Sequence, residues 1–423
     1  MMKYSNSITI LGSSGGVAKA ILSVLNKSVQ DKYDPLNAVI ENSLIHLIDK
    51  KQVDKAYFEQ HFTNLKNQFA FHQFDLTESK KLIEHLKKTN TTVVIDVSWA
   101  DTVEMMQCCD QLGVDYVNTA LENPYIDENE ELFEGFGLIE RLRHLEKHKD
   151  SISNSASIIC SGMNPGVVQW MAIELLKKEP TKEVPLACYI VEHDSSFYKD
   201  KKKAKKNTIY TTWSPECFLD EAILSYPMFM SQKTPLFLYE NVYDLEFKVT
   251  LGDKQFYGSL MPHEEVYTLG KLYNMESGFL YKINDHTTEL ILTNIEDVDK
   301  LWDFEMKVLD PMDGALEGED LCGVLLVYND REKYMYNVLK NEDIFSKYQT
   351  NATYFQVACG VYASLAVLLL DDIENGAYYV DELLVHTNNH FGDYLTYYMT
   401  DFVIGENNKT DGLLLERIRR NKK

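Results

Sequence analysis

The fold is decided by the stretch Ser7-Ile8-Thr9-Ile10-Leu11-Gly12-Ser13-Ser14-Gly15-Gly16-Val17-Ala18-Lys19-Ala20-Ile21-Leu22. It predicts a short apolar strand, a glycine-rich turn and an amphipathic helix. Glycines allow positive φ and close approach of the backbone, and the N–H groups at the start of the helix attract phosphate. We therefore expect Gly12, Ser14, Gly15, Gly16 and Val17 to contact a dinucleotide, with Ser14 in place of the usual middle glycine. An ordinary strand-to-helix turn is the alternative.

Strands and helices alternate after this stretch. Further strands are predicted at Ser43–Asp49, Phe71–Asp75, Thr92–Val97, Val114–Asn118 and Ala156–Cys160, separated by segments of helical periodicity. This alternation is typical of an α/β fold with a parallel, doubly wound, Rossmann-like sheet. Because cofactors bind such sheets at the carboxyl ends of the strands, we expect Asp75, Ser98, Thr119 and Glu122 to face one crevice.

Asp49 ends the second predicted strand, where this fold places the carboxylate that accepts hydrogen bonds from the adenosine ribose. A carboxylate there repels a ribose 2′-phosphate, which predicts NAD rather than NADP. The spacing from the glycines is longer than the usual ~20 residues and requires an insertion around residues 27–42. The alternative is that Asp49 only forms a turn or caps a helix.

The composition is that of an average globular protein. The chain has 423 residues, of which 45% are hydrophobic and 25% charged, which suggests two or three folding units. Its net charge of −23 argues against sequence-independent nucleic-acid binding and would suit a cationic ligand. Seven cysteines without paired spacing argue for a reducing compartment and against disulfides or a zinc site, so we expect no metal.

Neither a signal peptide nor a membrane span is expected. A core strand begins close to the first residue, which leaves no room for a signal peptide. The apolar run 355–370 is shorter than a membrane span and contains Gln356 and Ser364, so it predicts a buried helix that Asn351 caps. These features predict a cytoplasmic protein.

From about residue 183 the sequence predicts a second, α+β domain with hairpins, including a turn at 251–253. A strand over 187–191 ends at Glu192, and the basic run 199–206 predicts a solvated loop. Ser214 and Pro215 suit the start of a helix. Glu221 follows on a partly apolar face of that helix, and a half-buried carboxylate favours a bound cation.

Three further positions have both a functional and a structural interpretation. His263 begins a short helix beside two carboxylates, but a single histidine is more often structural than catalytic. Asp320 lies in a glycine-punctuated acidic loop, 314–323, which predicts either a solvated turn or a cation site. Asn164, before Pro165, suits a helix N-cap with proline in the first turn, so any functional role needs other support.

Five ordered motifs resemble bacterial homospermidine synthase, a member of the saccharopine-dehydrogenase-like group. They are Gly162-Met163-Asn164-Pro165-Gly166, Thr211-Thr212-Trp213-Ser214-Pro215-Glu216 with Glu221, Met261-Pro262-His263-Glu264, Gly318 to Leu326, and Asn351-Ala352-Thr353 through Gln356-Val357. The resemblance runs from residue 7 to beyond 360. The glycine loop, Asn123-Pro124 and the single acid at Asp320 depart from the family pattern, and the chain is shorter.

The resemblance implies an NAD-dependent enzyme that joins two putrescine molecules, or putrescine and spermidine, and releases an amine. NAD oxidises one amine to an imine, the second amine replaces the nitrogen, and the same NADH reduces the new imine. Motif matches place Glu122, Asn164, Glu192, Trp213, Glu221, His263 and Asp320 at family site positions. Trp213 would hold an ammonium group by a cation–π contact, and His263 is the candidate for proton transfer because imidazole titrates near neutral pH.

Two alternatives remain at this point. One is another secondary-amine-forming dehydrogenase, of the carboxynorspermidine or saccharopine type, whose carboxylate substrate would require an arginine that the motifs lack. The other is a non-catalytic dinucleotide-binding sensor.

The predicted domains are 1–165 for the dinucleotide, 166–350 for the substrate, and a C-terminal helical segment, 351–423, that packs on the first domain. We expect a homodimer, with no nucleic-acid or membrane partner.

Overall fold

The computed structural model describes residues 6–180 and 183–420. Its chain forms two compact units, each built from several segments. Among the described residues, unit 1 contains 6–129, 139–167 and 355–399, and unit 2 contains 130–138, 168–180, 183–354 and 400–420.

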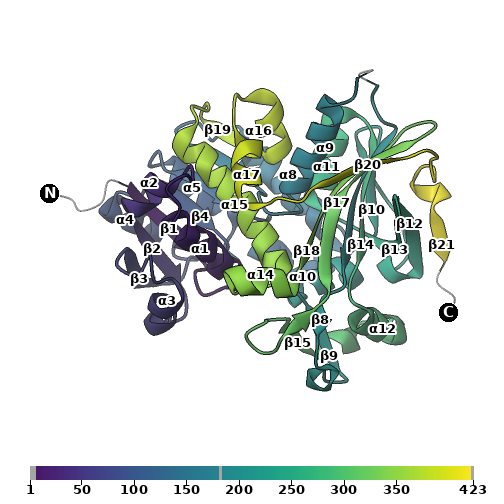
Figure 1. Cartoon of the computed structure of the whole chain (residues 1–423), viewed down its shortest axis with the longest axis horizontal. Coiled ribbons are helices and arrows are strands. Elements are labelled where there is room, and N and C mark those ends of the chain that lie inside the picture. The colour runs from purple at the N-terminus through teal and green to yellow at the C-terminus, as the bar shows by residue number, and fades with distance from the viewer. Residues whose placement is uncertain (1–5, 181–182, 421–423) are drawn as a thin grey trace. The chain divides into compact units, whose positions relative to one another are not determined.

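Unit 1 is built on a seven-stranded parallel sheet with the strand order β19-β6-β5-β4-β1-β2-β3 (Figure 1). Its strands are β1 (Asn6–Leu11), β2 (Ser43–Asp49), β3 (Phe69–Gln73), β4 (Val93–Asp96), β5 (Asp115–Asn118), β6 (Ala156–Ile159) and β19 (Gly376–Tyr379). Its helices include α1 (Gly16–Ser28), α2 (Asn37–Glu41), α3 (Lys55–His61), α4 (Ser79–Thr89), α5 (Thr102–Asp110), α6 (Pro124–Asp127), α16 (Val380–His386) and α17 (Phe391–Tyr398). The predicted doubly wound sheet is confirmed, with β3 lying two residues earlier than expected.

Three of the described helices have residues in both units: α8 (Gly137–Lys149), α9 (Val167–Lys177) and the apolar helix α15 (Ala352–Leu370). As predicted, Asn351 caps α15, since its Oδ1 accepts from Tyr354 N at 2.8 Å. Within the described ranges, α15 alone has the length and hydropathy of a membrane span, but 78% of that window is buried. Such burial is typical of a core helix.

Unit 2 contains a ten-stranded mixed sheet, whose main path has the order β20-β18-β17-β7-β14-β13-β12-β21. These strands are β7 (Ala187–Asp194), β12 (Leu245–Leu251), β13 (Lys254–Met261), β14 (Glu276–Lys282), β17 (Glu319–Val327), β18 (Glu332–Lys340), β20 (Val403–Asn407) and β21 (Ile418–Arg420), joined by β10 (Met228–Ser231) and β11 (Thr234–Phe237). Two short sheets pair β15 (Glu305–Val308) with β9 (Thr208–Thr211) and β16 (Leu316–Glu317) with β8 (Phe197–Tyr198). Its helices include α7 (Glu130–Phe133), α9 (Val167–Lys177), α10 (Pro215–Leu219), α11 (Glu264–Tyr273), α12 (Asp285–Asn294), α13 (Asp299–Trp302) and α14 (Asn341–Tyr348).

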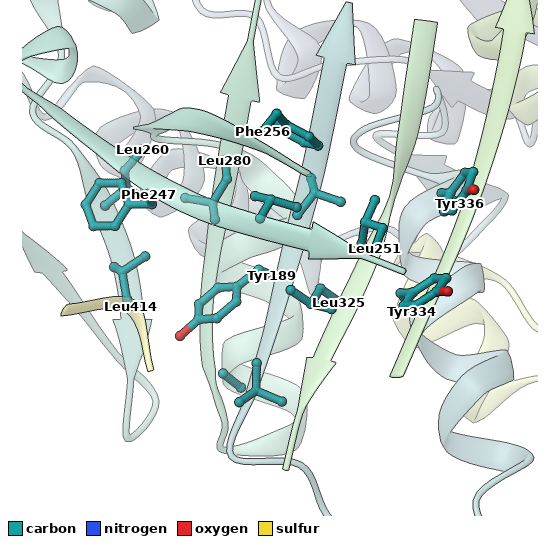
Figure 2. Close-up of a cluster of buried hydrophobic side chains, with 14 of the residues drawn as sticks. Tyr189, Phe247, Leu251, Phe256, Leu260, Leu280, Leu325, Tyr334, Tyr336 and Leu414 are labelled. Atoms are coloured by element: carbon teal, nitrogen blue, oxygen red, sulfur yellow. The ribbon is translucent and has the colours of Figure 1, made fainter. Parts of the chain in front are cut away.

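The two faces of this sheet differ in chemistry because side chains alternate along a strand. On β7, Tyr189 and Val191 enter an apolar cluster with Leu280 of β14 and Leu325 of β17 (Figure 2). The intervening β7 residues, including Glu192, point to the opposite face. Burying the first face fixes the register, so the polar residues of the second face are held at defined positions.

The C-terminal segment differs from the prediction. Residues 355–399 lie in unit 1, whereas residues 400–420 lie in unit 2. The reason is strand pairing, since β20 adds to β18 and β21 adds to β12. The sequence after residue 400 is therefore part of the second sheet rather than of a helical segment.

Candidate functional site

The glycine-rich turn joins β1 to α1. Gly12 has φ +73°, and a Cβ there would lie 2.5 Å from the carbonyl oxygen of Val97, so only glycine fits. Gly15 N donates to Gly12 O at 3.1 Å and closes the turn. No side chain caps the N-terminus of α1, and the buried Ser13 Oγ has no hydrogen-bond partner within the described residues. The backbone N–H groups here suit a phosphate, so the turn fits a dinucleotide.

Asp49 lies beside this turn. One carboxylate oxygen accepts from Ser14 N at 2.9 Å and from Ser14 Oγ at 2.6 Å, and the other accepts from Lys51 N at 2.9 Å. Asp49 thus forms the turn that the alternative interpretation predicted. It also lies at the glycine loop, as the ribose-binding interpretation requires.

The other predicted cofactor contacts follow neighbouring strands. Asp75 follows β3, and its hydrogen bond with Lys50, reinforced by Thr77, lowers its pKa to about 2. Ser98 follows β4 and donates to Asp96 at 2.6 Å, while burial raises the pKa of Asp96 to about 6. Thr119 follows β5. These residues therefore lie at the carboxyl ends of β3, β4 and β5, as the parallel sheet requires.

Glu122 and Asn164 also belong to unit 1. Glu122 is half-buried after β5, and its backbone N–H donates to Thr102 Oγ1 at 3.0 Å. The capping interpretation of Asn164 is wrong, because α9 begins only at Val167. Gly162 N instead donates to Pro165 O at 2.7 Å, and Val167 N donates to Gly162 O at 3.1 Å, so residues 162–166 form a tight turn.

In unit 2, three carboxyl groups lie on the polar face of the sheet. Glu192 and Asp194 are two residues apart on β7, and Asp320 of β17 pairs directly with Asp194. Their exposed fractions are 4%, 0% and 1%. We call these three residues the acid row. The prediction of an acidic loop is wrong from residue 319 onward. Asp320 lies in strand β17, which pairs with β7.

Two threonines connect Asp194 to Asp320. Thr212 Oγ1 lies 2.6 Å from Asp194 Oδ2, Thr353 Oγ1 lies 2.5 Å from Asp320 Oδ2, and the two hydroxyl oxygens are 2.8 Å apart. Three hydrogen bonds require three protons, but the two hydroxyl groups supply only two. A carboxyl group must supply the third.

The electrostatics favour Asp320 as the group that holds this proton. Burial, together with the charges of Glu192 and Asp194, raises the pKa of Asp320 well above its usual range. Burial also raises the pKa of Asp194. Within the described part of the chain, neither residue has a cationic side chain as partner. The acid row therefore retains a proton.

Trp213 and Tyr281 border the acid row. Tyr281 of β14 pairs with Glu192 in register, so both point to the same face. Trp213 Nε1 donates to the Tyr281 hydroxyl oxygen at 3.2 Å. Burial and the nearby charges of Glu192 and Asp194 raise the pKa of Tyr281, so its phenol stays neutral. The indole is half-buried and is connected to the acid row through Tyr281.

Glu221 and His263 form a second group in unit 2. As predicted, Ser214 caps α10, but the chain continues as a π-helix over Asp220–Leu224, so the expected i−3 and i−4 spacing of Glu221 is not kept. Glu221 Oε1 lies 3.9 Å from His263 Nε2, and His263 Nδ1 bonds to Glu265.

The charge of His263 differs from the prediction. Burial alone would lower its pKa, but the charges of Glu265, Glu221 and Glu264 outweigh burial and raise it to about 10. The neighbouring carboxylates therefore favour the protonated form of His263, and its role in proton transfer stays a prediction.

Sequence reasoning missed Asp194, Thr212, Tyr281 and Thr353 as members of these groups. Asp194 had a usable signal, because it follows Glu192 by two residues in a strand and so shares its face. Thr212 and Thr353 stood within the motifs quoted above. The pairing of Asp194 with Asp320 spans 126 residues, which no local pattern reveals.

Comparisons with known proteins agree on the fold. Residues 8–137 match the family model of the saccharopine dehydrogenase NADP-binding domain. The structure is similar to apo saccharopine dehydrogenase (L-Glu forming) from Saccharomyces cerevisiae, with a TM-score of 0.58 and 10% identity over 95% of this chain and 100% of that chain. Pen from Bacillus thuringiensis has a TM-score of 0.26 and 13% identity, covering 42% of this chain and 58% of that chain.

A comparison with curated protein sequences gives no match. Residues 8–137 are therefore similar to the NADP-binding domain of saccharopine dehydrogenase, and the chain has a fold similar to that of saccharopine dehydrogenase.

Proposed function

We propose that this protein is an NAD-dependent enzyme of the homospermidine synthase type, which joins two putrescine molecules, or putrescine and spermidine. With putrescine alone, two molecules give homospermidine and ammonia. The observation that carries the proposal is the acid row, a set of buried carboxyl groups without a described cationic partner for Asp194 or Asp320. A diammonium substrate supplies the missing charge.

The arginines of the chain favour a diamine over an amino-acid substrate. All six form ion pairs with carboxylates: Arg141 with Asp127, Arg143 with Glu140, Arg331 with Glu183, Arg417 with Glu332, Arg419 with Glu246, and Arg420 with Glu240. A substrate carboxylate is commonly held by a bidentate arginine. The acid row would repel such a group, so the site is better suited to amines at both ends.

Each residue has a distinct part in the proposed reaction. The nicotinamide would accept a hydride from the amine carbon and return it after the exchange of amines. Asp194 and Asp320 would hold an ammonium group, and the Trp213 ring would cover it and keep water from the imine. Binding of the cation would release the Asp320 proton, because the ammonium group replaces it as the partner of the carboxylate.

The cofactor preference rests on Asp49. Its carboxylate at the glycine loop favours an unmodified ribose, although the family model describes an NADP-binding domain. Calorimetric titration with NAD and NADP tests this preference. We expect tighter binding of NAD, and tighter binding of NADP would overturn it.

Labelled putrescine tests the activity. The purified protein, incubated with catalytic NAD and putrescine deuterated at both amine carbons, should give homospermidine that retains the transferred deuterium, with no net gain of NADH. Mass spectrometry identifies the product. The second candidate function, a saccharopine dehydrogenase-type reductase, is favoured by the family match. It predicts no homospermidine and stoichiometric consumption of NADPH with an amine and an oxoacid.

A further inference from the structure

Three histidines lie together in unit 1, outside the glycine loop. His46 of β2 pairs with Ala70, and His72 of β3 pairs with Ile48, so the two imidazoles are diagonal neighbours on one face of the sheet. His85 of α4 completes the group. The ring centroids are 5.1 Å apart for His46 and His72, 5.2 Å for His46 and His85, and 4.5 Å for His72 and His85.

The nitrogen atoms of this group are not all satisfied by the protein. His46 Nδ1 and His72 Nε2 share a hydrogen bond at 2.9 Å. Nε2 of His46 and Nε2 of His85 are buried without a hydrogen-bond partner within the described residues, and these side chains are only 4% and 9% exposed. A buried polar atom without a partner is costly, so such a pair indicates a missing ligand.

The ring nitrogens have the spacing and chemistry of metal ligands. One nitrogen from each imidazole lies within 4.8 Å of the others. Zinc binds imidazole nitrogen at about 2.0–2.1 Å, which places two ligand atoms of a tetrahedral site roughly 3.4 Å apart. His46 Nδ1 and His72 Nε2 lie 2.9 Å apart, so these two nitrogens would have to move slightly apart to bind one ion.

The surroundings favour neutral imidazoles, which is the form that binds metal. Burial, reinforced by the neighbouring histidines, lowers the pKa of His46 to about 4 and that of His85 to about 3. Lys88 is the nearby cation that opposes a metal charge, but its side chain is exposed and therefore screened by solvent.

We propose that His46, His72 and His85 bind one divalent transition-metal ion of the zinc class. Three nitrogen ligands select zinc, cobalt, nickel or copper over calcium or magnesium, which prefer oxygen. The ion would tie β2, β3 and α4 together three residues before Asp49, which contacts the glycine loop. It would thus stabilise the edge of the dinucleotide-binding sheet.

Titration of the metal-free full chain with Zn²⁺ and Co²⁺ tests this proposal. We expect one equivalent to bind, a rise in the thermal unfolding temperature of the wild type, and for Co²⁺ the intense visible bands of a tetrahedral site. His72→Gln, at the more exposed ligand, and His85→Gln should each weaken binding by about tenfold or more. Circular dichroism without metal shows whether each variant is folded.

Two control variants separate this site from other histidines. His148→Gln removes one ring of a pair on α8 whose centroids are 4.8 Å apart, and His263→Gln alters a second cluster with Glu264 and Glu265. Both should bind the metal as the wild type does. The proposal is overturned if the wild type binds no metal at micromolar concentrations. It also fails if folded His72→Gln keeps wild-type affinity, or if His263→Gln is the variant that loses binding.

Discussion

Two buried acids on neighbouring strands, Glu332 of β18 and Asp320 of β17, show how differently this protein treats a carboxyl group. The Glu332 side chain is fully buried and bonds to the equally buried guanidinium of Arg417. It also accepts from Asp411 N at 2.8 Å and from Asn407 Nδ2 at 2.9 Å. The protein itself neutralises Glu332, as expected for an acid that serves stability.

Asp320 is buried to the same degree, but its described partners are neutral. It contacts the Thr353 hydroxyl at 2.5 Å, and its other carboxyl oxygen has no hydrogen-bond partner within the described residues. The comparison teaches that burial alone does not identify a functional acid. What distinguishes Asp194 and Asp320 is that neither carboxyl group has a cationic side chain as its partner within the described residues.

The largest expected effect comes from breaking the compensated pair. Arg417→Met leaves Glu332 buried without its cation and should lower the free energy of unfolding by about 3–5 kcal/mol. Urea unfolding followed by circular dichroism measures this. The control Arg419→Met removes an exposed pair with Glu246 and should cost less than about 1 kcal/mol. Equal losses in the two variants would contradict the distinction.

Asp320→Asn should lower the affinity for putrescine without lowering the free energy of unfolding. It removes the need to bury a charge, so stability should stay equal or increase, while putrescine affinity should fall roughly 30- to 100-fold, which corresponds to about 2–3 kcal/mol. The matched control is Glu319→Gln, at the preceding residue of β17, whose carboxylate forms a half-buried pair with Lys254. We expect that variant to bind putrescine normally. A loss of stability without a loss of putrescine affinity would make Asp320 a structural acid.

Trp213 should contribute less than the acids. A desolvated cation–π contact is worth about 2 kcal/mol, so Trp213→Ala should lose roughly 30-fold in putrescine affinity and Trp213→Phe only part of that. Turnover and putrescine dependence should fall in the order wild type, Trp213→Phe, Trp213→Ala, with unchanged NAD affinity. If Trp213→Ala equals the wild type in turnover, the indole is a packing residue.

The charge of His263 should make the free energy of unfolding depend on pH. Its pKa is raised from 6.5 to about 10 by neighbouring carboxylates. The stability from its charge is therefore fully present below pH 6.5, and it is lost as pH rises through about 10, by at most about 1.4 kcal/mol per unit. Urea unfolding of wild type and His263→Gln between pH 6 and 10 should show a difference that shrinks with pH. A difference that grows with pH would contradict this charge state.

Much of the first sheet could be predicted because its signals are local. The run Ser43–Asp49 is a strand with the expected ends, and the glycines before α1 form the expected turn. The motifs also pointed to Asp320 and Trp213. Their setting could not be predicted, because the partner of Asp320 is set by the register of β17 against β7, which depends on the apolar side chains of the other sheet face.

Other errors have similar causes. Asn164 and Pro165 have the composition of a helix start, but the backbone turns at Gly166, with φ +130°, before α9 begins. Glu221 lies in a π-helix. The hydrophobic pattern of the sequence does not predict the residue spacing of a π-helix. The cluster of His46, His72 and His85 combines two strands and a helix, so no single motif contains it.

The most direct test of the central claim is calorimetric titration of the protein with putrescine in buffers of different ionisation enthalpy. If the acid row binds the diamine, putrescine should bind and release about one proton near neutral pH, since the ammonium group replaces the proton of Asp320. The observed enthalpy should then vary linearly with the buffer's ionisation enthalpy, and this dependence should vanish in Asp320→Asn. Absence of binding, or binding without proton release in the wild type, would contradict the account.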